Sequence, residues 1–242
     1  MHLLGLAIIG FVVVYGFADR ADTQVSAFDF HAFVIVILGS FGAVLVRSSP
    51  SIALRTFAIL RELVPGLQRV RGDVADMERE RTEVQTLWND GKRGQALAIA
   101  EGSRHEGIKK MVAQIINRAS PQANANVFQT LRHQELSTWQ PAIDNWVMLA
   151  KIGPSFGMVG TITGMIQMFK NMSADNLNIG AAMSLALLAT LYGVAFGAGV
   201  AGPIGHYLTD LLDERIGVLE RCEATSNELT ATGRGAVAAR AS

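Results

Sequence analysis

Three threonines are the main hydroxyl groups inside two apolar stretches of the 242-residue chain. Thr161 and Thr163 lie in Ile152–Phe169, and Thr190 lies in Asn176–Thr209; neither stretch contains Asp, Glu, Lys or Arg. Hydroxyls in such a setting either bond back to their own helix or line a path for water or ions. If the chain moves protons, the titrating carboxylate must come from another chain, because intramembrane proton paths use ionisable groups.

Small residues recur at helical spacing in the same two stretches. In the first they are Gly153, Gly157, Gly160 and Gly164, and in the second they are Ala189, Gly193, Gly197 and Ala201. Such stripes allow two helices to approach closely. The plain interpretation is packing of the two stretches within the chain. The alternative adds a pore-lining role in an oligomer.

Other chemistries find little support in the residues. Gly197–Gly202 matches G-x-G-x-x-G, but it lies inside a long apolar run, whereas the nucleotide fingerprint follows a strand. The five histidines have no metal-ligand spacing, and the single cysteine, Cys222, excludes a disulfide framework or a Cys-based zinc site. Lys+Arg and Asp+Glu both number 21, which argues against nucleic-acid binding. The sequence therefore predicts a protein that is not an enzyme and needs no metal or cofactor.

The elements that must position these groups are membrane spans. Four stretches of 17 residues or more lack Asp, Glu, Lys and Arg, namely Met1–Ala18, Phe30–Val46, Ile152–Phe169 and Asn176–Thr209. A spanning helix needs about 17–25 mostly apolar residues. The predicted fold is an all-α integral membrane protein with four transmembrane helices in two hairpins and a helical cytoplasmic insertion.

This pattern divides the chain into four parts. They are a first transmembrane hairpin (1–46), a cytoplasmic helical insertion (47–145), a second, pore-lining hairpin (146–209) and a cytoplasmic amphipathic tail (210–242). Segment Arg47–Asn145 holds 14 Lys+Arg and the tail holds four more, whereas the Asp19–Asp29 connection holds one. Because basic loops stay in the cytoplasm, we expect both termini there.

Helices are expected throughout the insertion and the tail. The expected helices are Ser51–Trp88 with an interruption near Pro65 and Gly66, Lys92–Glu101, His105–Arg118, Val127–Ala150 and the amphipathic Asp210–Thr230. Pro141 lies inside the fourth of them. A kink or a break is expected there, because proline lacks the donor that a helix interior needs.

Two segments carry a family resemblance. Gly153–Thr161 (GPSFGMVGT) resembles the third-span motif of the MotA/PomA family, the A subunits of bacterial flagellar stators. Ala186–Gly193 (ALLATLYG), followed by Gly202 and Pro203, resembles the fourth span of that family. The wider superfamily includes the TolQ and ExbB energisers, and the resemblance in layout covers nearly the whole chain.

The resemblance implies an ion-driven motor subunit of the bacterial inner membrane. In the family, five A subunits form a ring in the lipid around single-span MotB/PomB-like B subunits, whose aspartate carries the ion. Ion flow rotates the ring against the flagellar rotor and drives motility. The implied site residues are Thr161, Thr190 and Ala189 on the ion path, Pro154 and Pro203 at hinges, and Lys92, Arg93 and Glu101 at the rotor.

The transported ion and two other functions stay open at this point. Sodium-type members commonly have Thr-Thr where this chain has Ala189 and Thr190, and sodium favours oxygen ligands, so protons are expected over sodium. An ExbB/TolQ-like proton-driven energiser of an outer-membrane process is the first alternative. Those proteins usually have one span before the insertion, and two are predicted here. The second alternative is a membrane scaffold that conducts no ions.

Overall fold

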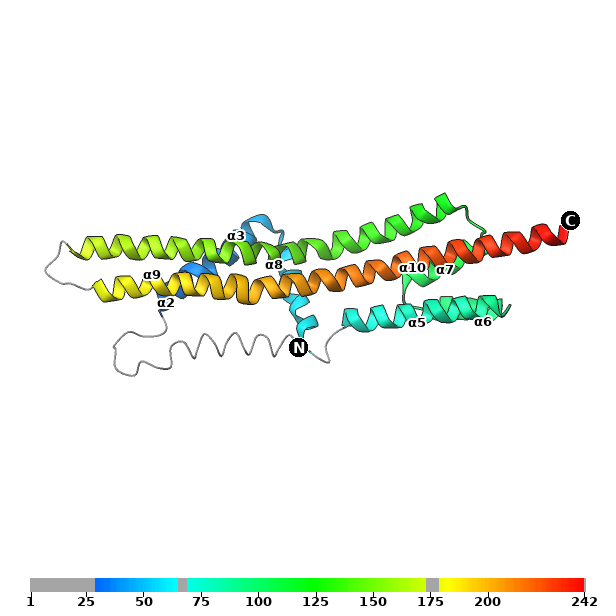
Figure 1. The fold of residues 1–242 in the computed structure, drawn as a ribbon, viewed down its shortest axis with the longest axis horizontal. Coiled ribbons are helices and arrows are strands. Elements are labelled where there is room, and N and C mark those ends of the chain that lie inside the picture. Colours follow the sequence, from blue (N-terminus) through cyan, green and yellow to red (C-terminus); the bar gives the residue numbers. More distant parts are fainter. Residues whose placement is uncertain (1–28, 65–68, 173–178, 242) are drawn as a thin grey trace. The chain divides into compact units, whose positions relative to one another are not determined.

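The computed structural model describes residues 29–64, 69–172 and 179–241, and regular structure in these ranges is helical, without a strand (Figure 1). In chain order the elements are α2 (Phe30–Phe33), η1 (Val34–Leu38), α3 (Gly39–Arg47), α4 (Pro50–Ala58), η2 (Ile59–Leu63), α5 (Arg69–Asn89), α6 (Arg93–Gly102), α7 (Glu106–Ile116), α8 (Pro121–Met172), α9 (Ile179–Val194), η3 (Ala195–Ala201) and α10 (Gly202–Ala241). The predicted all-α class is confirmed. The predicted span Met1–Ala18 lies outside the described residues, as do Pro65 and Gly66.

The chain forms two compact units that are interleaved in sequence. The first unit comprises residues 1–67 and 141–209, and the second comprises residues 68–140 and 210–242. Helices α8 and α10 each contribute to both units.

Two helices in the described part are long and apolar enough to cross a membrane. They are Phe30–Arg47, which combines α2, η1 and α3, and Ala182–Thr232. The predicted span Ile152–Phe169 in α8 is not one of them, because its glycines, threonines and Gln167 lower its mean hydropathy.

In the first unit, the start of the Phe30–Arg47 helix packs against α9. Asp29 caps this helix, since its carboxylate accepts hydrogen bonds from the backbone N–H groups of His31 and Ala32. The buried contact consists of Ala32, Val36, Leu185, Leu188 and Ala189. Lipid is as apolar as these side chains, so van der Waals packing rather than removal from water stabilises a contact of this kind.

The second unit has a hydrophobic core of its own. Phe128 from α8, Ile108 and Met111 from α7, Val84 from α5 and Val218 from α10 are fully buried in it. Burial of each such side chain stabilises the fold by about 1.5–3 kcal/mol. The unit is therefore a packed helical domain and not an extension held only by its long helices.

An ion-pair network ties α5 to α10 within the second unit. Glu78 Oε1 lies 2.7 Å from Arg81 Nη2, and Glu78 Oε2 lies 3.0 Å from Arg221 Nε. Arg81 Nη1 also donates a hydrogen bond to Thr225 Oγ1. Partial burial raises the pKa of Glu78, but the hydrogen bonds and charges of the two arginines outweigh it and hold the pKa below the ordinary value. Glu78 is thus kept ionised on the α5 surface.

The prolines of α8 do not break it. Pro121 is its first residue, where a missing N–H costs nothing and the fixed φ suits a helix. Pro141 was expected to kink or break the helix, and a break is excluded because α8 continues through it to Met172. Buried Ala142, Ile143 and Trp146 follow directly, and their packing offsets the roughly 3 kcal/mol that an interior proline costs.

Candidate ion pathway

Glycines bring α8 and α9 into backbone contact in the first unit. A Cβ on Gly193 would lie 2.7 Å from the Gly153 carbonyl oxygen and 2.9 Å from Gly157 Cα. A Cβ on Gly157 would in turn lie 3.0 Å from the Ala189 carbonyl oxygen. No larger residue fits at these positions without moving a helix, which is the packing role predicted for the stripe.

The remaining glycines of the two stripes lie in the same helix contact. At Gly164 a Cβ would lie 2.7 Å from the Ala182 carbonyl oxygen, and at Gly160 it would overlap the Ala189 methyl group. At Gly197 it would lie 2.5 Å from Cδ of Pro154. The predicted small-residue stripe is therefore used inside the chain.

The glycine contact brings the two predicted pathway threonines together. The Thr161 and Thr190 hydroxyls form a hydrogen bond across the α8–α9 contact. Thr161 Oγ1 lies 3.0 Å from the Gly157 carbonyl oxygen and 3.2 Å from that of Ala186, and Thr190 Oγ1 lies 3.3 Å from that of Ala186. Thr163 is not part of this pair, since it donates to the Val159 carbonyl of its own helix.

The threonine pair is chemically an acceptor site at the edge of the helix contact. Each hydroxyl has a single proton and two lone pairs, and the carbonyls and the partner hydroxyl can take up both protons. Lone pairs then remain for an outside donor, a protonated carboxyl group or a cation. Thr190 is exposed and Thr161 is half-buried, so such a group can reach them from outside the chain.

Ala189 is buried, in contrast to its exposed neighbour Thr190. It is fully buried, and it lies against Gly160 on α8 and in the cluster that α9 forms with α2. The structure thus places Ala189 inside the packing of the helices and Thr190 at their edge. A larger polar residue at Ala189 would require the helices to separate.

The two predicted hinge prolines lie in different settings. Pro154 lies inside α8 and faces Gly197 of the π-helical turn η3. Pro203 is exposed and follows η3 directly, where the Gly202 N–H donates to the Gly197 carbonyl five residues earlier. A proline ring crowds the carbonyl four residues before it, and a wider turn there relieves this crowding.

The predicted rotor residues all lie on the surface of the second unit. Lys92, Arg93 and Glu101 are exposed at α6. Lys92 Nζ lies 3.7 Å from Asp90, while the guanidinium of Arg93 lies 5.5 Å from the centre of the Trp88 ring. The three charges are thus accessible to a macromolecular partner.

Comparison with known proteins identifies the family. The profile of the MotA/TolQ/ExbB proton channel family matches residues 98–221, about half of the chain. The chain belongs to this family. Membership confirms the predicted resemblance and makes the chain a membrane protein.

Relatives in the MotA/TolQ/ExbB family extend the match beyond the profile. Motility protein A of Cereibacter sphaeroides is 29% identical over 208 residues, which cover 82% of this chain and 77% of that protein. Motility protein A of Treponema pallidum is 25% identical over 78% of this chain and 70% of its own length. Chemotaxis protein PomA of Vibrio alginolyticus is 43% identical over 58 residues, 24% of this chain and 22% of that protein.

Solved structures share the fold. A chain of C. jejuni MotAB aligns with a TM-score of 0.73 at 16% identity, covering 94% of this chain and 89% of that one. A chain of the flagellar MotAB stator complex from Bacillus subtilis aligns with a TM-score of 0.71 at 18% identity, covering 94% and 88%. The fold of this family member is therefore the one found in these stator complexes.

Sequence reasoning did not identify one polar cluster of the first unit. Asn145 Nδ2 donates to Thr56 Oγ1 at 2.8 Å, and Asn145 Oδ1 accepts from Ser48 Oγ at 3.1 Å. Trp146 Nε1 donates to the backbone carbonyl of Thr56 at 2.9 Å. Both Asn145 and Thr56 are buried. The available signal was the polar pair Asp144 and Asn145 beside a tryptophan in the otherwise apolar run Ala142–Ala150. This cluster fixes α4 against α8.

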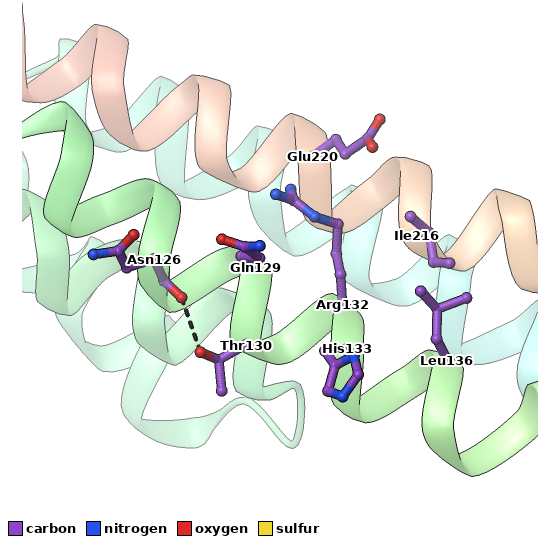
Figure 2. Close-up of a pocket in the computed structure, with 8 residues that line it drawn as sticks. All are labelled: Asn126, Gln129, Thr130, Arg132, His133, Leu136, Ile216 and Glu220. Atoms are coloured by element: carbon purple, nitrogen blue, oxygen red, sulfur yellow. Dashed lines mark hydrogen bonds between the residues drawn. The ribbon is translucent and has the colours of Figure 1, made fainter.

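A groove also lies between α8 and α10 in the second unit. It has a volume of about 740 Å³, and its lining consists of Asn126, Gln129, Thr130, Arg132, His133, Leu136, Ile216 and Glu220 (Figure 2). Arg132 is engaged with Glu223 at 2.7 Å, and Thr130 donates to the Asn126 carbonyl. The groove is open, and its lining offers no cysteine or serine nucleophile and no pair of carboxylates.

Proposed function

We propose that this chain is the A subunit of a bacterial flagellar stator, which conducts ions across the inner membrane and applies torque to the rotor. The observation that carries the proposal is the Thr161–Thr190 pair, exposed at the edge of two glycine-packed helices. The apolar stretches of both helices contain no carboxylate. A pathway that has acceptors but no titrating group needs a partner that supplies one.

The partner is a single-span MotB/PomB-like B subunit with a membrane aspartate. Five copies of the chain surround the B-subunit spans, and both termini of each copy lie in the cytoplasm. Pro154 and Pro203 act as hinges, and Lys92, Arg93 and Glu101 contact the rotor. The close contact of α8 with α9 supports the ring, because it makes the second hairpin a stiff wall.

Protons are the transported ion in this proposal. Ala189 provides no hydroxyl and its methyl group fills the space in front of Gly160, so the site offers fewer oxygens than a sodium ion prefers. The Thr161–Thr190 pair is sufficient to hydrogen-bond a carboxyl group that takes up and releases a proton.

Ion flux through the reconstituted complex tests the proposal. The chain is co-purified with a MotB-type subunit, and flux into vesicles is followed as a function of pH and of sodium at fixed pH. We expect flux that follows the proton gradient, ignores sodium and disappears when the B-subunit aspartate is replaced with asparagine. A requirement for sodium would overturn the proton assignment, and flux without a B subunit would overturn the shared pathway.

Motility separates the stator from an energiser of an outer-membrane process. Expression of the chain with its B subunit in a non-motile strain that lacks stators should restore swimming. Proton flux without restored swimming, in a strain that assembles its rotor, would favour the ExbB/TolQ-like alternative.

A further inference from the structure

The corner between α5 and α6 is rigid. Gly91 has φ +78°, and the hydrogen bonds from its N–H to the Trp88 carbonyl (3.1 Å) and from the Lys92 N–H to the Leu87 carbonyl (2.9 Å) form a Schellman motif. Helix α6 begins two residues later, with Lys92 as its N-cap. The turn therefore sets where Arg93 begins the next helix.

This turn places Arg93 over an aromatic ring. The Arg93 guanidinium lies 5.5 Å from the centre of the Trp88 ring, within the range of a cation–π contact. Trp88 is half-buried and packs against the core of the second unit. The ring is thus a fixed support for an exposed, flexible side chain.

The two neighbouring cations differ in how they are engaged. Lys92 lies 3.7 Å from Asp90, whereas Arg93 has no ion pair or hydrogen bond through its side chain within the described residues. Stacking uses the face of the guanidinium and leaves its N–H groups, which lie along the edge, available for a carboxylate. Arg93 therefore keeps both its charge and its donors for a partner.

We propose that Trp88 is a positioning residue for the rotor contact, holding Arg93 ready for an acidic group of the partner. The inference rests on the rotor role of Arg93 in the proposed function. A guanidinium already held in place loses less side-chain freedom when it binds. Trp88 itself touches no rotor group.

A double-mutant cycle tests this inference in swimming cells. The full chain is expressed with its B subunit in a strain without stators, as wild type, Trp88→Leu, Arg93→Gln and the double variant. The measured quantity is the dwell time of the fluorescently tagged complex at the rotor. We expect Trp88→Leu to shorten the dwell time by about two- to fivefold, the factor that a cation–π contact at an exposed site supplies. In the Arg93→Gln background the same change should have no further effect.

Graded and matched variants separate positioning from folding. Trp88→Phe keeps a smaller aromatic face and should retain part of the dwell time that Trp88→Leu loses. Trp139→Leu removes a half-buried tryptophan of the same unit that is not among the residues packed against the core at Trp88, and it should leave the dwell time unchanged. Equal losses for Trp88→Leu with and without Arg93 would overturn the positioning role while Arg93 keeps its own. Wild-type dwell times for Arg93→Gln would overturn the rotor role of Arg93, and the positioning role with it.

Discussion

The Thr190 hydroxyl is an acceptor at the exposed edge of the α8–α9 contact, and its removal should reduce ion flux. Valine has nearly the volume of threonine but cannot hydrogen-bond a carboxyl group or water. A hydrogen bond to a charged group contributes about 1.5–3 kcal/mol, so we expect Thr190→Val to lower flux by about tenfold or more. Flux into vesicles containing the purified complex measures the effect.

Thr161→Val tests the second hydroxyl of the proposed pathway in the same flux measurement. The alternative is that the hydroxyls only serve nearby carbonyls, as Thr161 Oγ1 does with the Gly157 carbonyl oxygen at 3.0 Å. In that case removal of one hydroxyl should cost about 0.6 kcal/mol of hydrogen-bond free energy or less. Unchanged flux in both Thr190→Val and Thr161→Val would remove the pair from the pathway.

Gly193 is the position at which helix separation can be tested most directly. A methyl group there would lie 2.7 Å from the Gly153 carbonyl oxygen, and we expect Gly193→Ala to destabilise the protein by about 1–3 kcal/mol. Gly42→Ala is the matched control, because no atom outside its own helix lies within 4 Å of a Cβ at Gly42. Thermal unfolding in detergent should show a lower midpoint for Gly193→Ala alone; equal midpoints would contradict the contact.

At the scale of elements, the turn after α5 depends on Gly91. Its φ of +78° lies in the left-handed region, so Gly91→Ala should destabilise the second unit by about 1 kcal/mol although space for a methyl group exists. Gly94→Ala lies inside α6 with similar space, and it should stabilise by about 0.5–1 kcal/mol through helix propensity. Opposite shifts of the unfolding midpoint check the pair, and shifts of the same sign would exclude the turn geometry.

The attachment of α5 to α10 should depend on pH through Glu78. Arg81 and Arg221 hold its folded pKa below the unfolded value, so the folded state is favoured above pH 4.5 and this contribution is lost as the pH falls through the lowered pKa. The protection of α5 against hydrogen exchange, after correction for the intrinsic exchange rate at each pH, should fall on acidification in the wild type. In Glu78→Gln the rate, corrected for intrinsic exchange, should change less with pH. An identical pH dependence in the two proteins would show that another group is responsible.

At the scale of the whole molecule, the proposed ion pathway and the proposed rotor contact lie on different units. The threonine pair belongs to the first unit, whereas Arg93 and Glu101 are exposed on α6 of the second. We therefore expect the double reversal Arg93→Glu with Glu101→Lys to reduce swimming severely while assembly and ion flux persist. Swimming speed, native mass spectrometry and vesicle flux measure these three properties. Normal swimming, or loss of flux together with swimming, would contradict the division.

Composition and local patterning were sufficient for the helical class and the small-residue stripes, whereas the family was inferred from the resemblance of two motifs, Gly153–Thr161 and Ala186–Gly193. An apolar stretch without charge indicates a span by its length, and glycines every three or four residues indicate one face of a helix. Both patterns can be seen along the sequence of a single helix. The glycine at position 91 likewise has a local cause, since glycine adopts its φ of +78° without strain.

Only the tertiary structure decided how these features combine. Pro141 was expected to kink or break α8, but long-range packing of the residues that follow it keeps the helix unbroken. Ala189 and Thr190 are adjacent in sequence, yet the approach of Gly160 buries the first and leaves the second exposed. The Thr56–Asn145 cluster and the Trp88–Arg93 contact depend on how helices and a turn meet in three dimensions. Periodicity along one helix carries no information about which residue of another helix lies opposite it, and for that reason the sequence predicted the helices but not these contacts.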